Sequence, residues 1–208
     1  MTLILLVAAL LGAQAAPAPA LAPAPPTTAA EAPKADLVPV ALETSLGRIV
    51  VALERRRAPI TTANFLRYVD TKRFDGQTFY RAMKNGPEGG LIQGGLTTDA
   101  RKLLPPIAHE PTSQTGLKHV AGSLSMARLT PGSAKADFFI LTTDIPGFDA
   151  GASGGDADGF AVFGHVIEGM DVVKAIYAAP TSPTKGKGVM KGEMLDPPVK
   201  IIKAVRVK

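Results

Sequence analysis

Two polar residues stand in sequence contexts where they could do chemistry: Arg81 follows Phe79-Tyr80, and Gln93 precedes Gly94-Gly95. An arginine guanidinium is always charged and rigid, so it can hold a hydrogen-bond donor at a defined place. A fixed donor stabilises electron density that develops in a transition state, without a covalent step, a metal or a general base. The alternative for Arg81 is an ordinary surface arginine on a strand, and a glutamine before two glycines means little by itself.

Other kinds of catalytic site find little support in the sequence. The chain has no cysteine, which excludes disulfides, Cys-ligated zinc and a thiol nucleophile. His109, His119 and His165 are far apart and not at metal-ligand spacing, and no phosphate-binding glycine motif or Ser-His-Asp signature stands out. Residues 156–159 resemble the start of a calcium loop, but Ile167 occupies the twelfth position, which needs a glutamate. We therefore expect no metal and no cofactor.

Short β-type runs separated by turn residues make up most of the chain after residue 37. Pro59 favours the first turn of a helix that ends near Lys72-Arg73, and residues 170–177 predict a second helix. Many short strands with two helices predict an antiparallel barrel or a sandwich, and the pattern alone does not choose between them. The predicted strands are residues 38–42, 48–54, 79–83, 91–94, 122–126, 138–141, 161–166 and 199–207.

The first 37 residues differ from the rest in composition. Residues 3–11 are apolar and Ala13-Gln14-Ala15 follows as a small-x-small site, which predicts a secretory signal peptide over residues 1–15. No Lys or Arg precedes the apolar run, and the alternative is a buried N-terminal helix. Residues 16–37 are rich in Pro and Ala and predict an extended, disordered linker. We expect one folded domain over residues 38–208.

Five short fragments occur together in one order along this folded part. They are Phe-Tyr-Arg at 79–81, Ile-Gln-Gly-Gly at 92–95, Gly-Ser-Leu-Ser-Met-Ala-Arg at 122–128, Phe-Phe-Ile at 138–140 and Val-Phe-Gly-His-Val-Ile-Glu-Gly-Met at 162–170. From about Val40 onward the chain resembles the cyclophilins, the peptidyl-prolyl cis-trans isomerases. The resemblance implies a closed eight-stranded antiparallel β-barrel capped by two α-helices, a monomer, and catalysis of rotation about Xaa-Pro bonds. With the signal peptide, it implies a bacterial, periplasmic enzyme that assists the folding of exported proteins.

The same resemblance assigns roles to single residues. Arg81 would donate to the prolyl nitrogen as that nitrogen becomes pyramidal, and Gln93 would hydrogen-bond the substrate backbone. Phe139 would form the floor on which the proline ring sits, with Leu91 in the place of a pocket methionine. The substrate backbone would lie along Ala127-Arg128.

Alternation along a strand predicts that Phe138 and Phe139 face opposite ways, one into the core and the other outward. An outward aromatic is more useful to a ligand than to stability. Without the other motifs, a Phe-Phe-Ile strand serves the core more often than a pocket.

The chain departs from the family pattern around this pocket. Gly90 stands where a phenylalanine is usual, Asp137 replaces a glutamine, and Phe160 stands where many members have histidine. The chain has no Trp, and Phe148 lies in the stretch where eukaryotic members carry the tryptophan that binds cyclic drugs. We assign Asp137, Phe160 and Phe148 to the substrate-binding set, and we expect weak or no cyclosporin binding.

The net charge of +5 lies in residues 185–208, which hold seven basic and two acidic residues. A basic terminus can contact nucleic acid or anionic lipid, but a solvated edge strand with outward lysines explains it more simply. Residues 3–11 are too short to span a bilayer, which takes about 20 apolar residues. We expect proline-containing polypeptides as partners, no nucleic acid and no stable membrane insertion. The alternative function, motivated by the altered rim, is a chaperone or peptide-binding module with little turnover.

Overall fold

The structure is a computed structural model that describes residues 36–84, 89–96 and 100–207 of the 208-residue chain. The predicted signal peptide, and the predicted linker up to residue 35, lie outside the described residues. The first strand, β1 (Leu37–Thr44), begins one residue before the predicted start of the folded domain.

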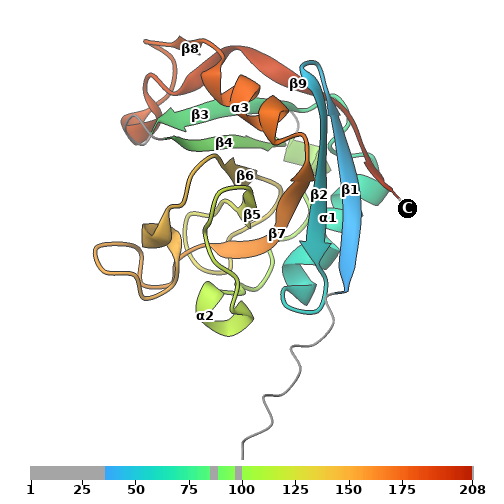
Figure 1. Cartoon of the computed structure of the whole chain (residues 1–208), viewed down its shortest axis with the longest axis vertical. Coiled ribbons are helices and arrows are strands. Elements are labelled where there is room, and N and C mark those ends of the chain that lie inside the picture. Colours follow the sequence, from blue (N-terminus) through green and yellow to red (C-terminus); the bar gives the residue numbers. More distant parts are fainter. Residues whose placement is uncertain (1–35, 85–88, 97–99, 208) are drawn as a thin grey trace, which may run out of the picture. The chain divides into compact units, whose positions relative to one another are not determined.

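Eight antiparallel strands close into a barrel (Figure 1). β1 pairs with β2 (Gly47–Glu54) on one side and with β9 (Met194–Arg206) on the other, which closes the sheet. This confirms the predicted barrel and removes the sandwich as an alternative. The order round the ring is β1, β2, β7 (Ala161–Glu168), β5 (Ser123–Met126), β6 (Phe138–Leu141), β4 (Gly90–Gly95), β3 (Thr78–Lys84) and β9.

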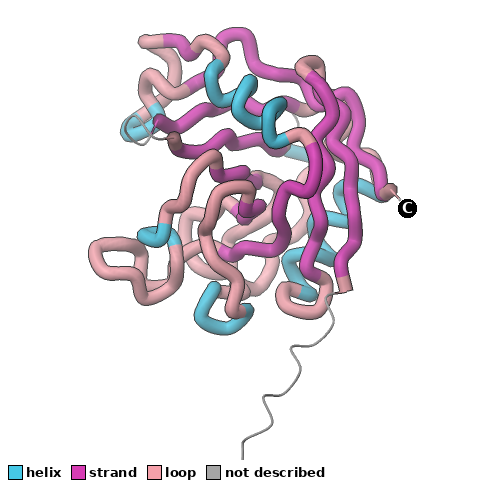
Figure 2. The backbone as a smooth tube through the Cα atoms, viewed as in Figure 1, coloured by secondary structure: helices cyan, strands magenta, loops and turns pink. Residues whose placement is uncertain are grey.

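The two helices that the sequence predicted, α1 (Pro59–Asp70) and α3 (Met170–Ala178), accompany the barrel and are among the helical segments in Figure 2. Helix α1 contacts β2, β7 and β9, whereas helix α3 contacts β2, β3 and β4. In the β1–β2 hairpin, Gly47 has φ of +136°, and a Cβ there would lie 2.8 Å from Cγ2 of Val172. A glycine at this turn therefore lets α3 pack directly onto the hairpin.

The sequence did not predict the shortest elements. Helix α2 (Thr112–Thr115), strand β8 (Thr181–Ser182) and the 3₁₀ turns at 100–102, 146–148 and 188–190 are too short to show a periodic pattern. β8 pairs with β9 outside the ring.

The last strand begins earlier than predicted, at Met194 instead of residue 199. Its pairing with β3 is irregular, because Arg81 lies opposite Met194 and Phe79 lies opposite Val199. Pro197 and Pro198 lie between Met194 and Val199. Because prolines have no backbone N–H to donate to a sheet, they argue against a strand in the sequence, and the first part of β9 was therefore not predicted.

The barrel is filled by aromatic side chains. Phe65 of α1 reaches the ring of Phe138 at a centroid distance of 5.2 Å, edge to face, and Phe138 meets Phe79 in the same way at 5.7 Å. Such edge-to-face pairs add to the stabilisation that burial alone gives. Phe139 lies in a second, separate apolar cluster with Leu91. The predicted alternation of the two phenylalanines is thus confirmed.

Candidate active site

The register of three neighbouring strands brings the candidate catalytic residues into one row. Arg81 of β3 lies opposite Gln93 of β4, and Gln93 lies opposite Phe139 of β6. Because directly opposed residues point to the same face of a sheet, these three side chains share one face. The sequence placed them in separate motifs, and strand pairing is what assembles them.

This row borders an open cavity of about 1020 Å³. All nine residues that the sequence assigned to the site line it: Arg81, Leu91, Gln93, Ala127, Arg128, Asp137, Phe139, Phe148 and Phe160. The sequence did not single out a further group of lining residues: Tyr80, Met83, Leu96, Leu103, Pro106, Val189, Met190 and Met194.

One half of the cavity is apolar, and Phe139 is its centre. The Phe139 side chain packs edge to face against Phe148 at 5.8 Å and against Phe160 at 5.4 Å. Met83, Leu91 and Ala127 belong to the same apolar cluster and also line the cavity. Three rings around one open space form a surface that can receive a small apolar ring such as that of proline.

The other half of the cavity carries a continuous chain of hydrogen bonds. The Nη1 group of Arg81 donates to Oε1 of Gln93 at 2.8 Å, and Nε2 of Gln93 donates to the Tyr80 hydroxyl at 2.7 Å. Tyr80 is hydrogen-bonded in turn to the carboxylate of Asp137, which also accepts the backbone N–H of Leu96. Since arginine has only donors, its bond fixes which way the Gln93 amide faces.

Burial shifts the titration of two groups in this chain. Desolvation raises the pKa of Tyr80, and the nearby Asp137 carboxylate raises it further. Desolvation also raises the pKa of Asp137, against the lowering effect of its hydrogen bonds from Leu96 and Tyr80. Tyr80 therefore stays protonated near neutral pH and can act as the donor to Asp137.

Arg128 has a different set of contacts from Arg81. Its Nε donates to the carbonyl of Gly159 at 3.1 Å, its Nη2 pairs with Asp156 at 2.9 Å, and its guanidinium lies 5.2 Å from the ring centroid of Phe160. With only 2% of the side chain exposed, Arg128 holds the 156–160 loop and its Phe160 ring against the cavity. Asp156, in the segment with a calcium-loop appearance, is an anchor for this arginine.

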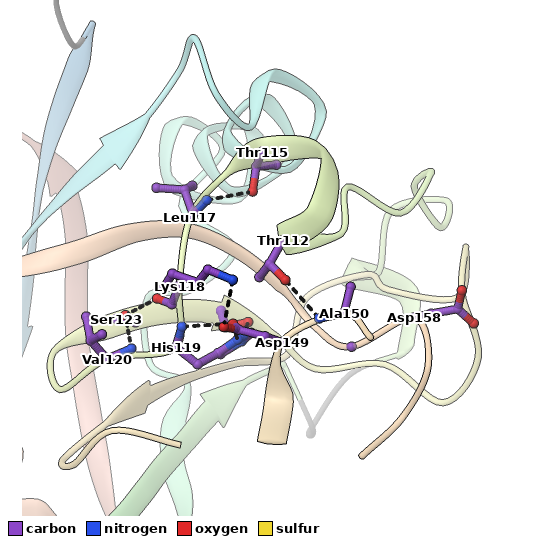
Figure 3. Close-up of polar contacts among 12 residues, drawn as sticks. Thr112, Thr115, Leu117, Lys118, His119, Val120, Ser123, Asp149, Ala150 and Asp158 are labelled. Atoms are coloured by element: carbon purple, nitrogen blue, oxygen red, sulfur yellow. Dashed lines mark hydrogen bonds and ion pairs between the residues drawn. The ribbon is translucent and has the colours of Figure 1, made fainter. Parts of the chain in front are cut away.

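A polar cluster around His119 and Asp149 lies next to the aromatic rings of the apolar half; Figure 3 shows its contacts. Oδ1 of Asp149 lies 2.8 Å from Nδ1 of His119 and accepts the His119 backbone N–H, while Lys118 pairs with its other oxygen. Nε2 of His119 lies 3.0 Å from Oγ of Ser125. Desolvation lowers the pKa of His119 in spite of the opposing effect of Asp149, so the imidazole is neutral near pH 7 and Nδ1 carries its hydrogen.

This Ser125–His119–Asp149 cluster has the composition of a hydrolytic triad, a feature the sequence analysis did not identify. Ser125 is 0% exposed, opposite Phe139 in the sheet, so no substrate carbonyl can reach its hydroxyl. The imidazole lies parallel to the Phe139 ring at 6.2 Å and edge-on to Phe148 at 5.8 Å. The cluster therefore holds the aromatic floor in place, and its position in the fold gives it no nucleophilic role.

Gly90 is the first residue of β4. Gly90 pairs with the segment after β6, where its N–H donates to Oγ1 of Thr142 at 2.8 Å. Within the described residues, no group of three or more His, Cys, Asp or Glu could hold a metal ion. Among those same residues, no helix is long and apolar enough to cross a membrane.

Comparison with known proteins identifies the family. The family model described as cyclophilin type peptidyl-prolyl cis-trans isomerase/CLD matches residues 39–205. A peptidyl-prolyl cis-trans isomerase of Streptomyces antibioticus is 39% identical over 151 residues, which cover 71% of this chain and 87% of the relative. One from Acinetobacter baylyi is 39% identical over 173 residues, covering 81% of this chain and 85% of the relative.

Solved structures agree with this result at the level of the fold. A cyclophilin type peptidyl-prolyl cis-trans isomerase of Cryptosporidium parvum superposes with a TM-score of 0.64 at 20% identity, and the match covers 83% of this chain and 98% of that chain. The barrel, the family match over residues 39–205 and the bacterial relatives lead to one conclusion: the chain belongs to the cyclophilin-type peptidyl-prolyl cis-trans isomerases.

Proposed function

We propose that this isomerase accelerates rotation about Xaa-Pro bonds in exported proteins, with Arg81 as the catalytic donor and Phe139 as the floor for the proline ring. The observation that carries the proposal is the row of Arg81, Gln93 and Phe139 across β3, β4 and β6, facing one cavity. The Cryptosporidium relative, at 20% identity, has a structure determined in the presence of the dipeptide Ala-Pro. We infer that a proline-containing ligand of that kind binds in the apolar half of this cavity.

The mechanism follows from what rotation does to the amide. Twisting the bond breaks amide resonance, with a barrier of about 18–20 kcal/mol, and leaves a lone pair on the prolyl nitrogen. A donor aimed at that lone pair favours the twisted amide over the planar one, which is transition-state binding without a covalent step. Arg81 is suited to this role because its guanidinium is held by neighbours while it borders the cavity.

Gln93 is held ready for the substrate backbone in a similar way. Its amide oxygen accepts from Arg81, and one of its two amide hydrogens goes to Tyr80. The second amide hydrogen is the group that we assign to a substrate carbonyl. A rate gain of about 10⁵-fold requires roughly 7 kcal/mol of transition-state preference. A charged donor supplies about 3 kcal/mol, so the ring floor and the backbone contacts must supply the rest.

The test is cis-trans exchange of a short Xaa-Pro peptide, measured by NMR with the wild type, Arg81→Ala and Arg81→Lys. We expect fast exchange with the wild type, a loss of about 100-fold or more in kcat/KM with Arg81→Ala, and partial activity with Arg81→Lys, which keeps the charge but not the planar fork. A folded wild type without exchange activity, or an active Arg81→Ala variant, would overturn the proposal. Export is tested separately, by locating the natural protein in periplasmic and cytoplasmic fractions.

A second candidate function rests on the rim of the cavity. Leu129 and Val189 line it while being 93% and 87% exposed, and such apolar groups suit binding of unfolded polypeptide without turnover. A chaperone role predicts that the protein suppresses aggregation of proline-free clients and that Arg81→Ala retains this effect. Suppression that disappears with Arg81→Ala, or that requires proline in the client, would contradict it.

A further inference from the structure

Arg81 has a second partner that lies outside all the recognised motifs. Oε2 of Glu193 accepts a hydrogen bond from Nε of Arg81 at 2.8 Å and forms an ion pair with Nη2 at 2.7 Å. Only 14% of the Arg81 side chain and 20% of the Glu193 side chain are exposed. Pairs held in this way, with two bonds and little solvent, orient a guanidinium much better than exposed surface pairs do.

The backbone places Glu193 at this position. The carbonyl of Glu193 accepts the N–H of Ala82 at 2.9 Å, and Arg81 lies opposite Met194, the first residue of β9. The carboxylate therefore starts from a main chain that is already hydrogen-bonded to β3, next to the arginine that it contacts. Little conformational entropy remains to be lost when the ion pair forms.

The Arg81 guanidinium has five N–H hydrogens, and its contacts within the protein use only some of them. Glu193 takes the hydrogen of Nε and one on Nη2, and Gln93 takes one on Nη1. Among the described residues, one hydrogen on each terminal nitrogen is left without a partner. With partners on two different edges, the guanidinium plane is fixed while those hydrogens remain available to a substrate in the cavity.

We propose that Glu193 is a positioning residue for the isomerase reaction: its carboxylate fixes the plane of the Arg81 guanidinium so that a free N–H faces the twisting prolyl bond. The inference rests on the proposed role of Arg81 as the donor. The same stretch brings Val189, Met190 and Met194 to the cavity, so residues 189–194 supply one wall of the site together with the group that orients its donor.

The variants Glu193→Ala and Glu193→Gln separate orientation from charge. Glu193→Ala removes the acceptor, and we expect kcat to fall about 10-fold while KM changes less than about 2-fold, because the lost contact acts on the donor and not on the bound substrate. A single oxygen accepts both bonds, so the amide oxygen of Glu193→Gln can replace it, and we expect a loss of only about 2- to 3-fold in kcat.

A matched control lies in the β1–β2 hairpin. Glu43 and Arg48 form a cross-strand ion pair, at 3.7 Å between Oε1 and Nε, and neither residue lines the cavity. Glu43→Ala should leave kcat and KM at their wild-type values. An unchanged kcat in Glu193→Ala would overturn the positioning role. The same changes in kcat and KM for Glu193→Ala and Glu43→Ala would also overturn it.

A spectroscopic measurement keeps the inference separate from the proposed function. In the wild type, the Arg81 Nε–H group should be ordered, and its hydrogen should exchange slowly with solvent, so that its ¹⁵N–¹H signal is observed. The signal should be retained in Glu193→Gln and Glu43→Ala and lost in Glu193→Ala. If Arg81 Nε is equally ordered in Glu193→Ala, the inference fails even if the protein is an active isomerase. If the wild type has no isomerase activity, the proposed function fails, and this signal still decides whether Glu193 orients the guanidinium.

Discussion

Phe138 and Phe139 are adjacent in β6 but lie in two regions of the molecule that differ in how completely they are filled. Phe138 is fully buried inside the barrel and packs edge to face against three other rings. Phe139 is only 3% exposed, yet it forms the floor of an open cavity on the other face of the sheet. The interior thus uses aromatic rings to fill space, whereas the outer face uses them to surround space that a ligand can occupy.

The largest expected effect is on the interior side of this comparison. Phe138→Ala leaves a void among Phe65, Phe74 and Phe79, and the surrounding barrel cannot collapse to fill it. We expect a loss of about 3–5 kcal/mol in the free energy of unfolding, measured by chemical denaturation. A loss below about 1 kcal/mol would contradict the close packing of the interior.

Phe139→Ala should show the reverse balance between stability and activity. One side of this ring already borders open space, so we expect a smaller loss of stability than for Phe138→Ala, about 2 kcal/mol. If Phe139 is the floor for the proline ring, as proposed, its removal should lower kcat/KM roughly 100-fold, measured by peptide exchange at a temperature where the variant is folded. Retention of wild-type kcat/KM would show that the ring is not part of the binding surface.

The two regions also differ in their dependence on pH, because the outer face rests on a buried histidine. The folded protein lowers the pKa of His119 by burial, so below its unfolded value of about 6.5 the unfolded chain binds more protons than the folded one. Stability contributed by the neutral ring is complete above that pH and is lost as the pH falls. We expect the free energy of unfolding to decrease between pH 7 and pH 5, by at most about 1.4 kcal/mol per pH unit from this group.

His119→Gln provides the comparison for that measurement. The variant has no titrating group at the position, so its unfolding free energy should change less steeply between pH 7 and pH 5 than that of the wild type. Asp149, whose pKa is lowered by its bonds to His119 and Lys118 in spite of burial, contributes in a lower window, below about pH 4. Equal slopes for wild type and variant would assign the pH dependence to other groups.

The sequence was a good guide wherever a residue and its context lie close together in the chain. The helix after Pro59, the strands on either side of the two phenylalanines and the alternation of Phe138 and Phe139 follow from local spacing, and the structure has them. Motif resemblance assigned nine candidate residues to the site, and the structure brings all of them to the lining of one cavity. Closure of the barrel depends on the β1–β9 pairing, which joins the two ends of the domain and leaves no local pattern.

The parts of the site that could not be predicted depend on contacts between distant segments. Glu193 lies 112 residues after Arg81, in a stretch whose glycines and prolines read as a loop. Asp149 is 30 residues from His119, and only the folded chain brings the two together with Ser125. Single acidic residues carry no pattern of their own, so strand register and loop placement had to be known before their partners could be identified.

The smallest expected effect concerns Tyr80, which connects Arg81 and Gln93 to Asp137. Tyr80→Phe removes the acceptor for Gln93 Nε2 and the donor to Asp137 while keeping the ring in the cavity wall. We expect a loss of about 1 kcal/mol in the free energy of unfolding, typical of a hydrogen bond, and a decrease of about 2- to 5-fold in kcat/KM. The activity should fall because Gln93 is then held by Arg81 alone and its amide is less well oriented toward the substrate. A matched variant, Tyr177→Phe on α3, lies outside the cavity lining and should leave kcat/KM unchanged; equal effects of the two substitutions would exclude a specific role for the Tyr80 hydroxyl.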